Sequence, residues 1–555
     1  MNKLKVGVII DNGIDSPLLD HLVFESSKTN KFIIKAIIKQ STPKADSSFY
    51  KKAVFLIKSR GIKRFLRDVS FKFLEFVEFK LFKIFTNFSL KKINNLSINN
   101  ITSIHVRPIV SKSGFIYKYK KEDLKKISDL DLDILIRGGS GILRGEILDL
   151  CKFGILSFHH ADSNVNRGGP PAFWEVYNHE SSTGFIIQKL SEELDGGDVL
   201  LKGSIGTSLI YSLNYYKLMS KSNIFLSKLL INIAEKKKLP NALPKIPYYG
   251  KLYSTPKISQ QIIYSYKTIV RAFIKIYDTI SQKGMRWSVA YQFTSKWNDV
   301  SLRKSKIIRN PPNRFYADPF IISHLNRNIC FVEDYCYKKS IGRISAIEIT
   351  ENGYNDLGIV LEEKFHLSFP FIFKVNNVVY MCPETYQSNE IRLYKCTEFP
   401  LKWELHKVIM KNVTAMDTII FKDNNKWWLM TNVDSSPLMH EGSELHLFHS
   451  DSFDSDNWQP HQENPVIFSS DKGRNAGFLL SGNSKYRVYQ KTGFGIYGRS
   501  MGVAQIKKLS QEEYVEQDCF EIKPDFFDNI LGTHTFSHSD DLLVFDFVKK
   551  EKIGT

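Results

Sequence analysis

The chain has few cysteines for its length, and none form closely spaced pairs. Six occur in 555 residues, with no Cys-x-x-Cys motif. Both a disulfide framework and a zinc ribbon would need paired cysteines, so this spacing argues against them. We expect reduced, mostly buried thiols at the following positions: Cys151, Cys330, Cys336, Cys382, Cys396 and Cys519.

Long apolar runs are also lacking. No segment supplies the roughly 18 unbroken apolar residues of a membrane-spanning helix, and the chain enters LKVGVIID without the apolar stretch of a signal peptide. We therefore expect a cytoplasmic protein, either free or peripheral on the inner membrane surface.

Acidic residues are outnumbered by basic ones. The 77 Lys and Arg against 58 Asp and Glu give a formal net charge of +19. This excess suits an anionic partner, whether nucleic acid, a membrane surface or a phosphorylated substrate, and charge alone does not choose among them. With 555 residues, of which 43% are hydrophobic, the chain should form at least two domains.

Residues 1–205 read as an α/β domain with a parallel sheet. The runs KVGVIID, FIIKAIIKQ and DLDILIRGG are rich in β-branched residues and are separated by stretches with helical potential. A basic, phenylalanine-rich insertion at residues 51–92 interrupts this rhythm. We expect one helical face to carry Phe73, Val77, Leu81, Ile84 and Phe88, with Lys72, Lys80 and Lys83 on the other. Two interpretations stay open, a helix packed on the sheet and a basic amphipathic helix on an anionic membrane surface.

The stretch ILSFHHADSNVNRGGPPAFWEV, residues 155–176, places two histidines at the end of an apolar run. In a parallel sheet, His159 and His160 would lie at the carboxyl edge of a strand, where open α/β sheets bind ligands. Further on, SEELDGGD forms an acidic turn whose glycines allow Asp195 to point back at the histidines.

Residues 133–200 resemble the catalytic core of the folate-dependent formyltransferases, which include methionyl-tRNA and sugar N-formyltransferases. In that family a strand ends in Asn-x-His, and Arg-Gly, Thr-Gly and Leu-Asp-x-Gly-Asp motifs follow. The matching residues here are His159, Arg167–Gly168, Thr183–Gly184 and Asp195, whereas Ser157 stands where the family has its catalytic Asn.

The resemblance implies a site and a cofactor. His159, Asp195 and Ser157 take the catalytic positions, and 10-formyltetrahydrofolate is the expected cofactor. The expected folate-binding residues are Arg137, Gly139, Ile142 and Leu194.

The chemistry of formyl transfer explains these residue types. An amine that attacks a formyl carbon creates an oxyanion and an ammonium, so hydrogen-bond donors and a positioned base are needed. Because Ser157 has a shorter reach than Asn, three outcomes stay open: a working formyltransferase, a relative with other chemistry, and a noncatalytic remnant.

Other roles for residues near this site also stay open. His160 either contacts substrate or satisfies a loop carbonyl, and Arg167 either recognises a phosphate or carboxylate or braces its loop. A metal site at these histidines is disfavoured, because adjacent strand residues point to opposite faces.

Residues 206–285 read as a helical linker region, and residues 286–555 as an all-β domain. Five segments recur about every 50 residues, a period typical of propeller blades. They contain YADPF, SFPF, AMDT, NAGF and THTF. Sugar and tRNA formyltransferases often carry a β-barrel after the catalytic domain. This sequence shows no such barrel, so the resemblance implies no nucleic-acid partner.

This half resembles the arabinanase-like five-bladed propellers, and more closely the N-terminal domain of plant glucosamine inositolphosphorylceramide transferases. The resemblance is carried by YADPF, FPFIF, MCPETY, MDTIIF and WWL. Asp318, Glu384 and Asp417 should converge on one central pocket. They would either support glycoside chemistry or cap blade turns around a pocket that binds sugar without cleaving it.

Together the two halves suggest a formyltransferase-like enzyme that acts on an amino sugar in surface polysaccharide or glycolipid biosynthesis, with a glycan-binding propeller. The alternatives are a glycosidase or glycosyl-transfer enzyme that acts through the propeller, and a noncatalytic carbohydrate-binding scaffold.

Overall fold

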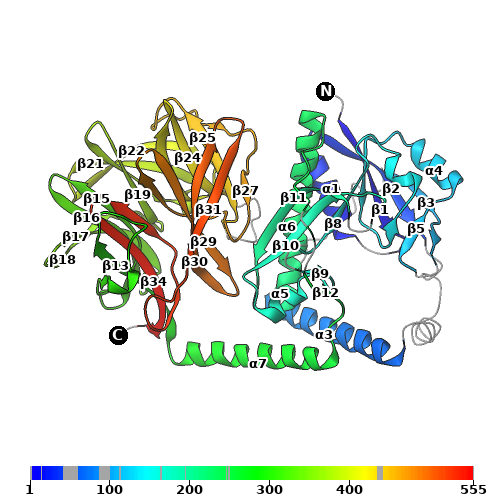
Figure 1. Ribbon diagram of the computed structural model, residues 1–555, viewed down its shortest axis with the longest axis horizontal. Helices are drawn as coiled ribbons and strands as arrows, with labels where there is room; N and C mark the ends of the chain where they lie inside the picture. Colours follow the sequence, from blue (N-terminus) through cyan, green and yellow to red (C-terminus); the bar gives the residue numbers. More distant parts are fainter. Residues whose placement is uncertain are drawn as a thin grey trace. The chain divides into compact units, whose positions relative to one another are not determined.

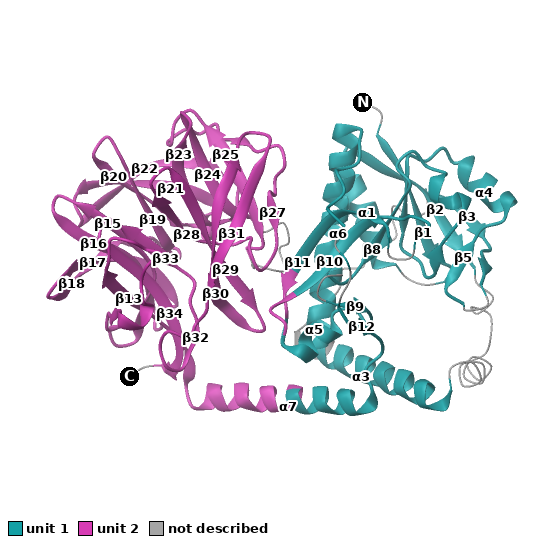
Figure 2. Ribbon diagram, in the orientation of Figure 1, with its two compact units in different colours: residues 1–179, 183–204, 208–267 teal, residues 180–182, 205–207, 268–555 magenta. Residues whose placement is uncertain are grey.

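A computed structural model describes residues 3–13, 16–41, 61–86, 101–111, 114–162, 166–193, 196–245, 247, 250–433 and 442–553. Two compact units emerge, coloured in Figure 2. Unit 1 comprises residues 1–179, 183–204 and 208–267, and unit 2 comprises residues 180–182, 205–207 and 268–555.

Unit 1 is built on a seven-stranded sheet with the order β11-β10-β8-β6-β1-β2-β3 (Figure 1). Its strands are β1 (Leu4–Asp11), β2 (Phe32–Gln40), β3 (Thr102–Val106), β6 (Ile134–Arg137), β8 (Ile155–His159), β10 (Ser182–Lys189) and β11 (Asp198–Gly206). The strands from β3 to β8 pair in parallel, which confirms the expected parallel sheet, and β10 joins β8 antiparallel.

Helices and two separate small sheets accompany this sheet. The helices are α1 (Pro17–Lys28), α3 (Ile62–Thr86), α4 (Lys121–Ser128), α5 (Phe173–Asn178), α6 (Tyr211–Lys236) and α7 (Ile258–Ile280), with the 3-10 turn η2 (Glu146–Asp149). The short strands are β4 (Ile109–Val110), β5 (Ile116–Lys118), β7 (Ile142–Leu143), β9 (Arg167–Gly168) and β12 (Leu252–Tyr253). Helix α1 begins where its sequence indicates, since Ser16 caps Leu19 N and Pro17 takes the first turn.

The region expected to be a helical linker contains two helices with different environments. Helix α6 is part of the core of unit 1, with Leu218, Phe225, Leu230 and Ile233 buried. Helix α7 begins in unit 1 and ends in unit 2.

Unit 2 is a five-bladed propeller. Four blades each run in sequence order from an innermost strand. The first blade consists of β15 (Arg314–His324), β16 (Arg327–Cys336), β17 (Ile341–Thr350) and β18 (Gly353–Leu361), and the second of β19 (Ser368–Val375), β20 (Val378–Glu384), β21 (Glu390–Glu398) and β22 (Lys402–Lys411). The third consists of β23 (Ala415–Asp423), β24 (Lys426–Val433), β25 (Glu444–Ser450), β26 (Gln459–Pro460) and β27 (Ile467–Phe468). The fourth consists of β28 (Asn475–Ser481), β29 (Ser484–Gly493), β30 (Ile496–Leu509) and β31 (Tyr514–Ile522). The described residues of this unit also include two 3-10 turns, η3 (Leu302–Lys304) and η4 (Tyr386–Ser388).

The fifth blade joins the two ends of the propeller. Strand β34 (Leu542–Lys552) pairs antiparallel with β13 (Lys283–Phe293) along the whole length of β13, and β14 (Lys306–Ile307) continues outward. On its other side β34 pairs with β32 (Ile530–Gly532) and β33 (Phe536–Ser539). The first strand of the propeller therefore shares a blade with the last, which closes the ring.

Asp546 on β34 ties this closing blade to the first blade. Its side chain is fully buried, and its Oδ1 accepts hydrogen bonds from the backbone N–H groups of His534 and Thr535, at 2.8 and 3.0 Å. Its Oδ2 accepts from Asp318 N at 3.1 Å. One carboxylate thus satisfies three buried donors that no strand ladder serves.

We predict that Asp546→Asn destabilises the propeller, because the amide replaces one acceptor oxygen with a donor. Each buried N–H left unsatisfied costs about 1–3 kcal/mol. Urea unfolding followed by tryptophan fluorescence measures this, since six of the seven tryptophans lie in unit 2. The exposed neighbour change Asp541→Asn should leave the midpoint unchanged, and equal midpoints for both variants would contradict the role of Asp546.

Candidate functional site

The carboxyl edge of the unit 1 sheet gathers polar side chains from neighbouring strands. Arg137 ends β6 and stands beside Ser157 of β8 in the parallel register. Its Nη1 donates to Ser157 Oγ at 3.1 Å. Since side chains alternate along a strand, half-buried His159 shares the face of Ser157. The guanidinium, hydroxyl and imidazole therefore lie at one edge of the sheet.

Arg137 is a buried cation in this cluster. Burial lowers the pKa of Arg137, and the charge of Asp11 at the end of β1 opposes that shift. Its Nε is buried and has no hydrogen-bond partner among the described residues.

A hydrogen-bond network beside Arg137 fixes the turn that follows β6. Asp11 Oδ1 accepts from Gln40 Nε2 at 2.6 Å, and Asp11 Oδ2 accepts from Ser140 N at 3.0 Å. A β-carbon on Gly139 would stand 2.7 Å from Gln40 Nε2, so a larger residue would displace the Gln40 side chain. Gly139 follows Arg137 by two residues, and Ile142 lies on β7, in a small sheet with β5. Their expected roles in folate binding stay predictions.

The two adjacent histidines point to different environments. The Nε2 atom of His160 lies 3.2 Å from Ser222 Oγ on α6, and its ring stacks on Phe158 with centroids 4.9 Å apart. Burial, reinforced by the charge of His159, lowers the pKa of His160 to about 3. His160 is therefore a neutral ring that joins β8 to α6, and His159 alone lies on the face of Ser157.

Other residues of the formyltransferase pattern hold the scaffold together. Thr183 Oγ1 accepts from Asn214 Nδ2 of α6 at 2.8 Å, which ties β10 to that helix. A β-carbon on Gly184 would stand 2.6 Å from the side chain of Asp162. These contacts explain why a Thr-Gly pair is needed at this point.

Three further site predictions have different outcomes. Arg167 lies on β9, where it is aligned with Leu252 of β12. Asp195 and Leu194 lie outside the residues that the structure describes. The expected catalytic partner of His159 therefore stays a prediction.

In unit 2 the structure brings Asp318, Glu384 and Asp417 together at the centre of the propeller. Asp318 and Asp417 occupy bulges of the innermost strands β15 and β23, where the ladder register shifts and φ is 49° and 47°. Aspartate tolerates this left-handed backbone better than most residues. Glu384 ends β20, the second strand of its blade, and all three side chains are buried.

The oxygen atoms of these carboxylates accept hydrogen bonds from neighbouring blades. Asp318 Oδ2 accepts from Phe369 N at 3.2 Å, and Asp318 Oδ1 accepts from Thr535 Oγ1 at 2.7 Å. Glu384 Oε2 accepts from Asp417 N at 3.2 Å. Because these bonds connect neighbouring blades, the carboxylates stabilise the centre of the propeller.

Sequence reasoning missed the two cations that balance these acids. Arg474 Nε donates to Asp417 Oδ2 at 2.6 Å, and its Nη2 lies 3.7 Å from Glu384 Oε2. His534 lies between Asp546, at 2.5 Å, and Asp318, at 3.4 Å. An alignment of the repeats would have placed His534 at the position of Asp318 and Asp417, whereas Arg474 lies two residues before that position in its repeat.

A further buried acid, Glu333, also escaped the sequence analysis. It pairs with Ala317 in β16 as Glu384 pairs with Ser368 in β20, so the two acids occupy equivalent places in adjacent blades. Burial and then the neighbouring acids raise the pKa of Glu333 well above its ordinary value. Its Oε1 lies 3.4 Å from His366 Nε2.

The same factors raise other pKa values at the axis. Burial, together with the charge of Asp417, raises the pKa of Glu384, and burial raises the pKa of Asp318. Burial lowers the pKa of His534, but the charges of Asp546 and Asp318 outweigh it and raise the pKa overall. Asp318, Glu384 and His534 therefore release their protons less readily than the same groups in water.

The side chains of Asp318, His534 and Asp546 also lie close enough together to hold one metal ion. Their ligand atoms all lie within 4.8 Å of one another, and all three residues are buried. The sequence analysis expected no metal site and did not consider this group.

Half-buried aromatic rings surround the axial end that carries these acids. Phe315 stacks on Tyr335 at 4.9 Å, and Tyr335 lies 5.6 Å from Tyr337 and 6.0 Å from His366. On the fourth blade, the 38% exposed ring of Tyr497 covers the Arg474 guanidinium at 4.6 Å. Rings of this kind are typical of the walls of ligand pockets.

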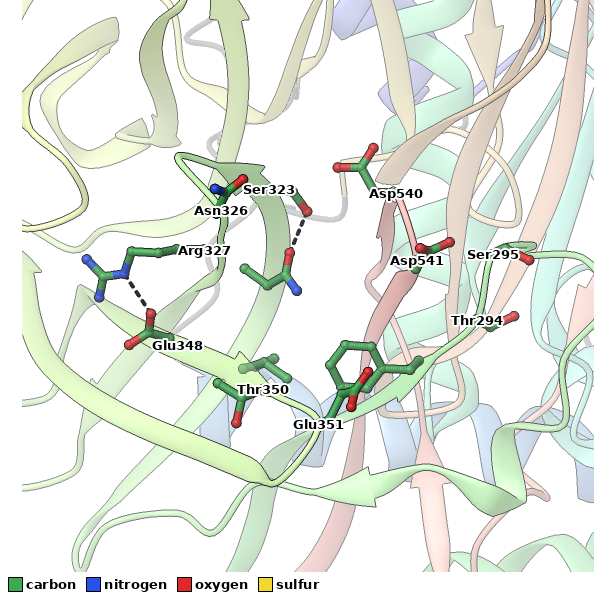
Figure 3. Close-up of a pocket in the computed structure, with 13 residues that line it drawn as sticks. Thr294, Ser295, Ser323, Asn326, Arg327, Glu348, Thr350, Glu351, Asp540 and Asp541 are labelled. Carbon is green, nitrogen blue, oxygen red and sulfur yellow. Dashed lines mark hydrogen bonds and ion pairs between the residues drawn. The ribbon is translucent and has the colours of Figure 1, made fainter.

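A hollow of about 660 Å³ lies at the other end of β15, away from the acids (Figure 3). Ser323, Asn326 and Arg327 of the β15–β16 hairpin line it. Arg327 also forms an ion pair with Glu348 in the wall of the hollow, with 2.6 Å between Nε and Oε1. It contains none of the predicted site residues, so the axial cluster remains the candidate site of unit 2.

A comparison with known proteins found a family model that matches most of unit 2. The family model described as "Glucosamine inositolphosphorylceramide transferase 1, N-terminal" matches residues 273–525, which lie within unit 2. Glucosamine inositolphosphorylceramide transferase 1 of Oryza sativa subsp. japonica is 36% identical over 212 residues, which cover 37% of this chain and 28% of the relative. The chain thus spans less than a third of that plant relative.

A second set of matches concerns formyltransferases. The methionyl-tRNA formyltransferase of Clostridioides difficile (strain 630) is 35% identical over 86 residues, which cover 15% of this chain and 28% of the relative. Among solved structures, an exo-1,5-alpha-L-arabinanase from a bovine ruminal metagenomic library is 15% identical, with a TM-score of 0.30, and covers 45% of this chain and 98% of its own. This chain therefore combines similarity to formyltransferases with similarity to the N-terminal part of a plant glycolipid transferase.

Proposed function

We propose that unit 1 transfers a formyl group to the amine of an amino sugar, that the propeller holds the attached glycan, and that the product belongs to a surface polysaccharide or glycolipid. The observation that carries this proposal is the contact of Arg137 Nη1 with Ser157 Oγ on the face of His159. It brings a guanidinium to the position where the formyltransferase family has its Asn.

The residues present fit 10-formyltetrahydrofolate. Arg137, with its unpartnered buried Nε, and Gly139, which lets the backbone approach closely, would hold the cofactor at the sheet edge. When bound, the cofactor would supply an activated formyl carbon for attack by an amine.

The side chains of this chain have defined tasks in that chemistry. Arg137 orients the hydroxyl of Ser157 and places a positive charge behind it, so negative charge on a nearby oxygen is stabilised in a buried setting. His159 donates a second hydrogen bond to that oxygen. Asp195, by its match to the family, accepts the proton that the amine must lose.

We predict that His159→Ala lowers the rate of formyl transfer by about 100-fold or more, the usual cost of losing one oxyanion donor. Purified full-length protein would be assayed with 10-formyltetrahydrofolate and a panel of nucleotide-linked amino sugars. Asp195→Ala should abolish transfer, while exposed His105→Ala is the matched control and should keep full activity. Retained transfer in the His159 and Asp195 variants would overturn the assignment, and a titration with reduced folate shows separately whether cofactor binds.

For the propeller, the geometry supports glycan binding more than glycoside cleavage. A glycosidase needs two carboxyl groups free to face the scissile bond. Here the oxygens of Asp318, Glu384 and Asp417 accept bonds from other blades and from Arg474. The aromatic rims of Tyr335, Tyr337 and Tyr497 offer apolar faces with polar edges, which suit the two sides of a sugar ring.

We predict that Tyr497→Ala weakens glycan binding about fivefold to tenfold, as expected for the loss of one aromatic contact worth about 1 kcal/mol. Calorimetric titration with amino-sugar oligosaccharides measures the affinity, and Phe520→Ala on the outer strand β31 is the control. Asp417→Asn should lower the unfolding midpoint instead. Hydrolysis of the oligosaccharides by the wild type that is lost in Asp417→Asn would favour the glycosidase alternative.

A further inference from the structure

One face of helix α3 consists of exposed apolar side chains. Phe73 is 68% exposed, and it belongs to a stripe with the spacing of one helical face. The exposed apolar side chains of this stripe are Ile62, Leu66, Val69, Phe73, Phe76, Val77 and Leu81. This apolar face is therefore left uncovered by unit 1.

The opposite face of α3 is the one held by unit 1. Glu75 Oε1 accepts from Tyr211 Oη at 2.7 Å, and Glu78 Oε1 accepts from Ser212 N at 2.7 Å. Phe71 and Phe79 pack against the ring of Tyr211, at 5.8 and 5.9 Å. Because these contacts fix the rotation of the helix, the apolar stripe is left outside the core of unit 1.

Helix α7 also carries an exposed apolar stripe. Gln261 and Tyr264 are buried, whereas Phe273 is 66% exposed. The exposed apolar side chains with helical spacing along α7 are Ile258, Ile262, Tyr266, Ile269, Phe273, Ile276, Tyr277 and Ile280. The stripe follows the helix from its first to its last residue, a length of about 35 Å for 23 residues.

Within unit 1 the two helices are tied together by their buried faces. Gln261 Nε2 donates to Arg67 O at 3.1 Å, and Tyr264 Oη donates to Glu78 Oε2 at 2.7 Å. Figure 2 shows α3 and the unit 1 part of α7 along the same edge of that unit. Their apolar stripes both point away from these contacts, into solvent.

The charges on α3 indicate what kind of partner covers the stripe. At 100° per residue, Lys63 and Lys72 flank the stripe on its two sides. Lys80 follows Ile62 by about five full turns, so it falls within the stripe and not on the opposite face as the sequence analysis had placed it. Its Nζ lies 5.7 Å from the ring of Phe76.

We propose that the exposed apolar stripes of α3 and α7 each contact lipid and seat the protein on an anionic membrane. A packed protein partner would have to bury the ammonium of Lys80, whereas at a membrane surface lysine extends to the headgroups while its stem stays among apolar groups. The net charge of +19 adds attraction to anionic lipid. Within the described ranges, no helix is both long and apolar enough to cross a bilayer. This surface is independent of the proposed formyl transfer.

Sedimentation with vesicles tests the proposal on the full chain. Phosphatidylcholine vesicles are compared with vesicles containing one quarter phosphatidylglycerol, at low and high salt. We expect the wild type to bind the anionic vesicles about tenfold more strongly than the neutral ones, and binding should weaken as salt rises.

Two double variants remove the stripes one at a time. Phe73→Ser with Phe76→Ser on α3, and Tyr266→Ser with Phe273→Ser on α7, should each weaken binding about tenfold, because apolar burial supplies much of the affinity. Leu405→Ser with Leu480→Ser removes two exposed apolar side chains of unit 2 and is the matched control, expected to bind as the wild type. Unchanged circular dichroism and unfolding midpoints establish that all variants fold.

Three results would overturn the proposal. The first is equal vesicle binding by the wild type and both stripe variants, and the second is no binding by the wild type to anionic vesicles. The third is a wild-type dimer that becomes a monomer in the stripe variants without vesicle binding, which would make the stripes a contact between copies of this chain.

Discussion

Buried side-chain oxygens that accept backbone N–H groups from the next blade hold the propeller together, and the arrangement of its centre depends on them. Blades contact only their neighbours, so a ring needs a repeated connection at its axis, where strand ladders do not reach. Four junctions use it: Asp546 to Asp318 N, Asp318 to Phe369 N, Glu384 to Asp417 N, and Asn432 to Asn475 N. At the remaining junction, between the fourth and fifth blades, the backbone N–H of Thr533 donates to Gly498 O, and the Trp297 side chain donates to Leu480 O.

This constraint also limits the chemistry that the centre can perform. A carboxylate that accepts from two or three fixed donors is held in its charged form by those bonds, while burial and the neighbouring acids favour the proton. Arg474 and His534 resolve the conflict by placing positive charge between the acids. Glu333 differs, because Asp318 already serves the N–H group that Glu384 serves one blade later. Among the acids of the axis, Glu333 is therefore the one that the ring of inter-blade bonds does not use.

Much of this organisation could be predicted from sequence, and the exceptions have physical causes. The β-branched runs placed Ser157 and His159 on a strand, and strand alternation separated His159 from His160. The five repeats identified the blades and the convergence of Asp318 with Asp417. The partners Arg474 and His534 were not evident, because bulge geometry and closure of the ring join residues more than 50 positions apart. For α3, periodicity revealed an apolar stripe but not which face packs, since Glu75 and Glu78 find buried partners in Tyr211 and Ser212 that no local pattern announces.

The edge of the unit 1 sheet shows how a substitution at one position is tied to its neighbours. Thr183 and Gly184 keep the pattern of the formyltransferases because Asn214 and Asp162 press against them, and these contacts concern the scaffold. Ser157 departs from that pattern, and its smaller side chain leaves room for the guanidinium of Arg137 to reach the strand. The serine and the arginine are therefore best regarded as one unit, in which a charged donor stands behind a short hydroxyl in place of a single long amide.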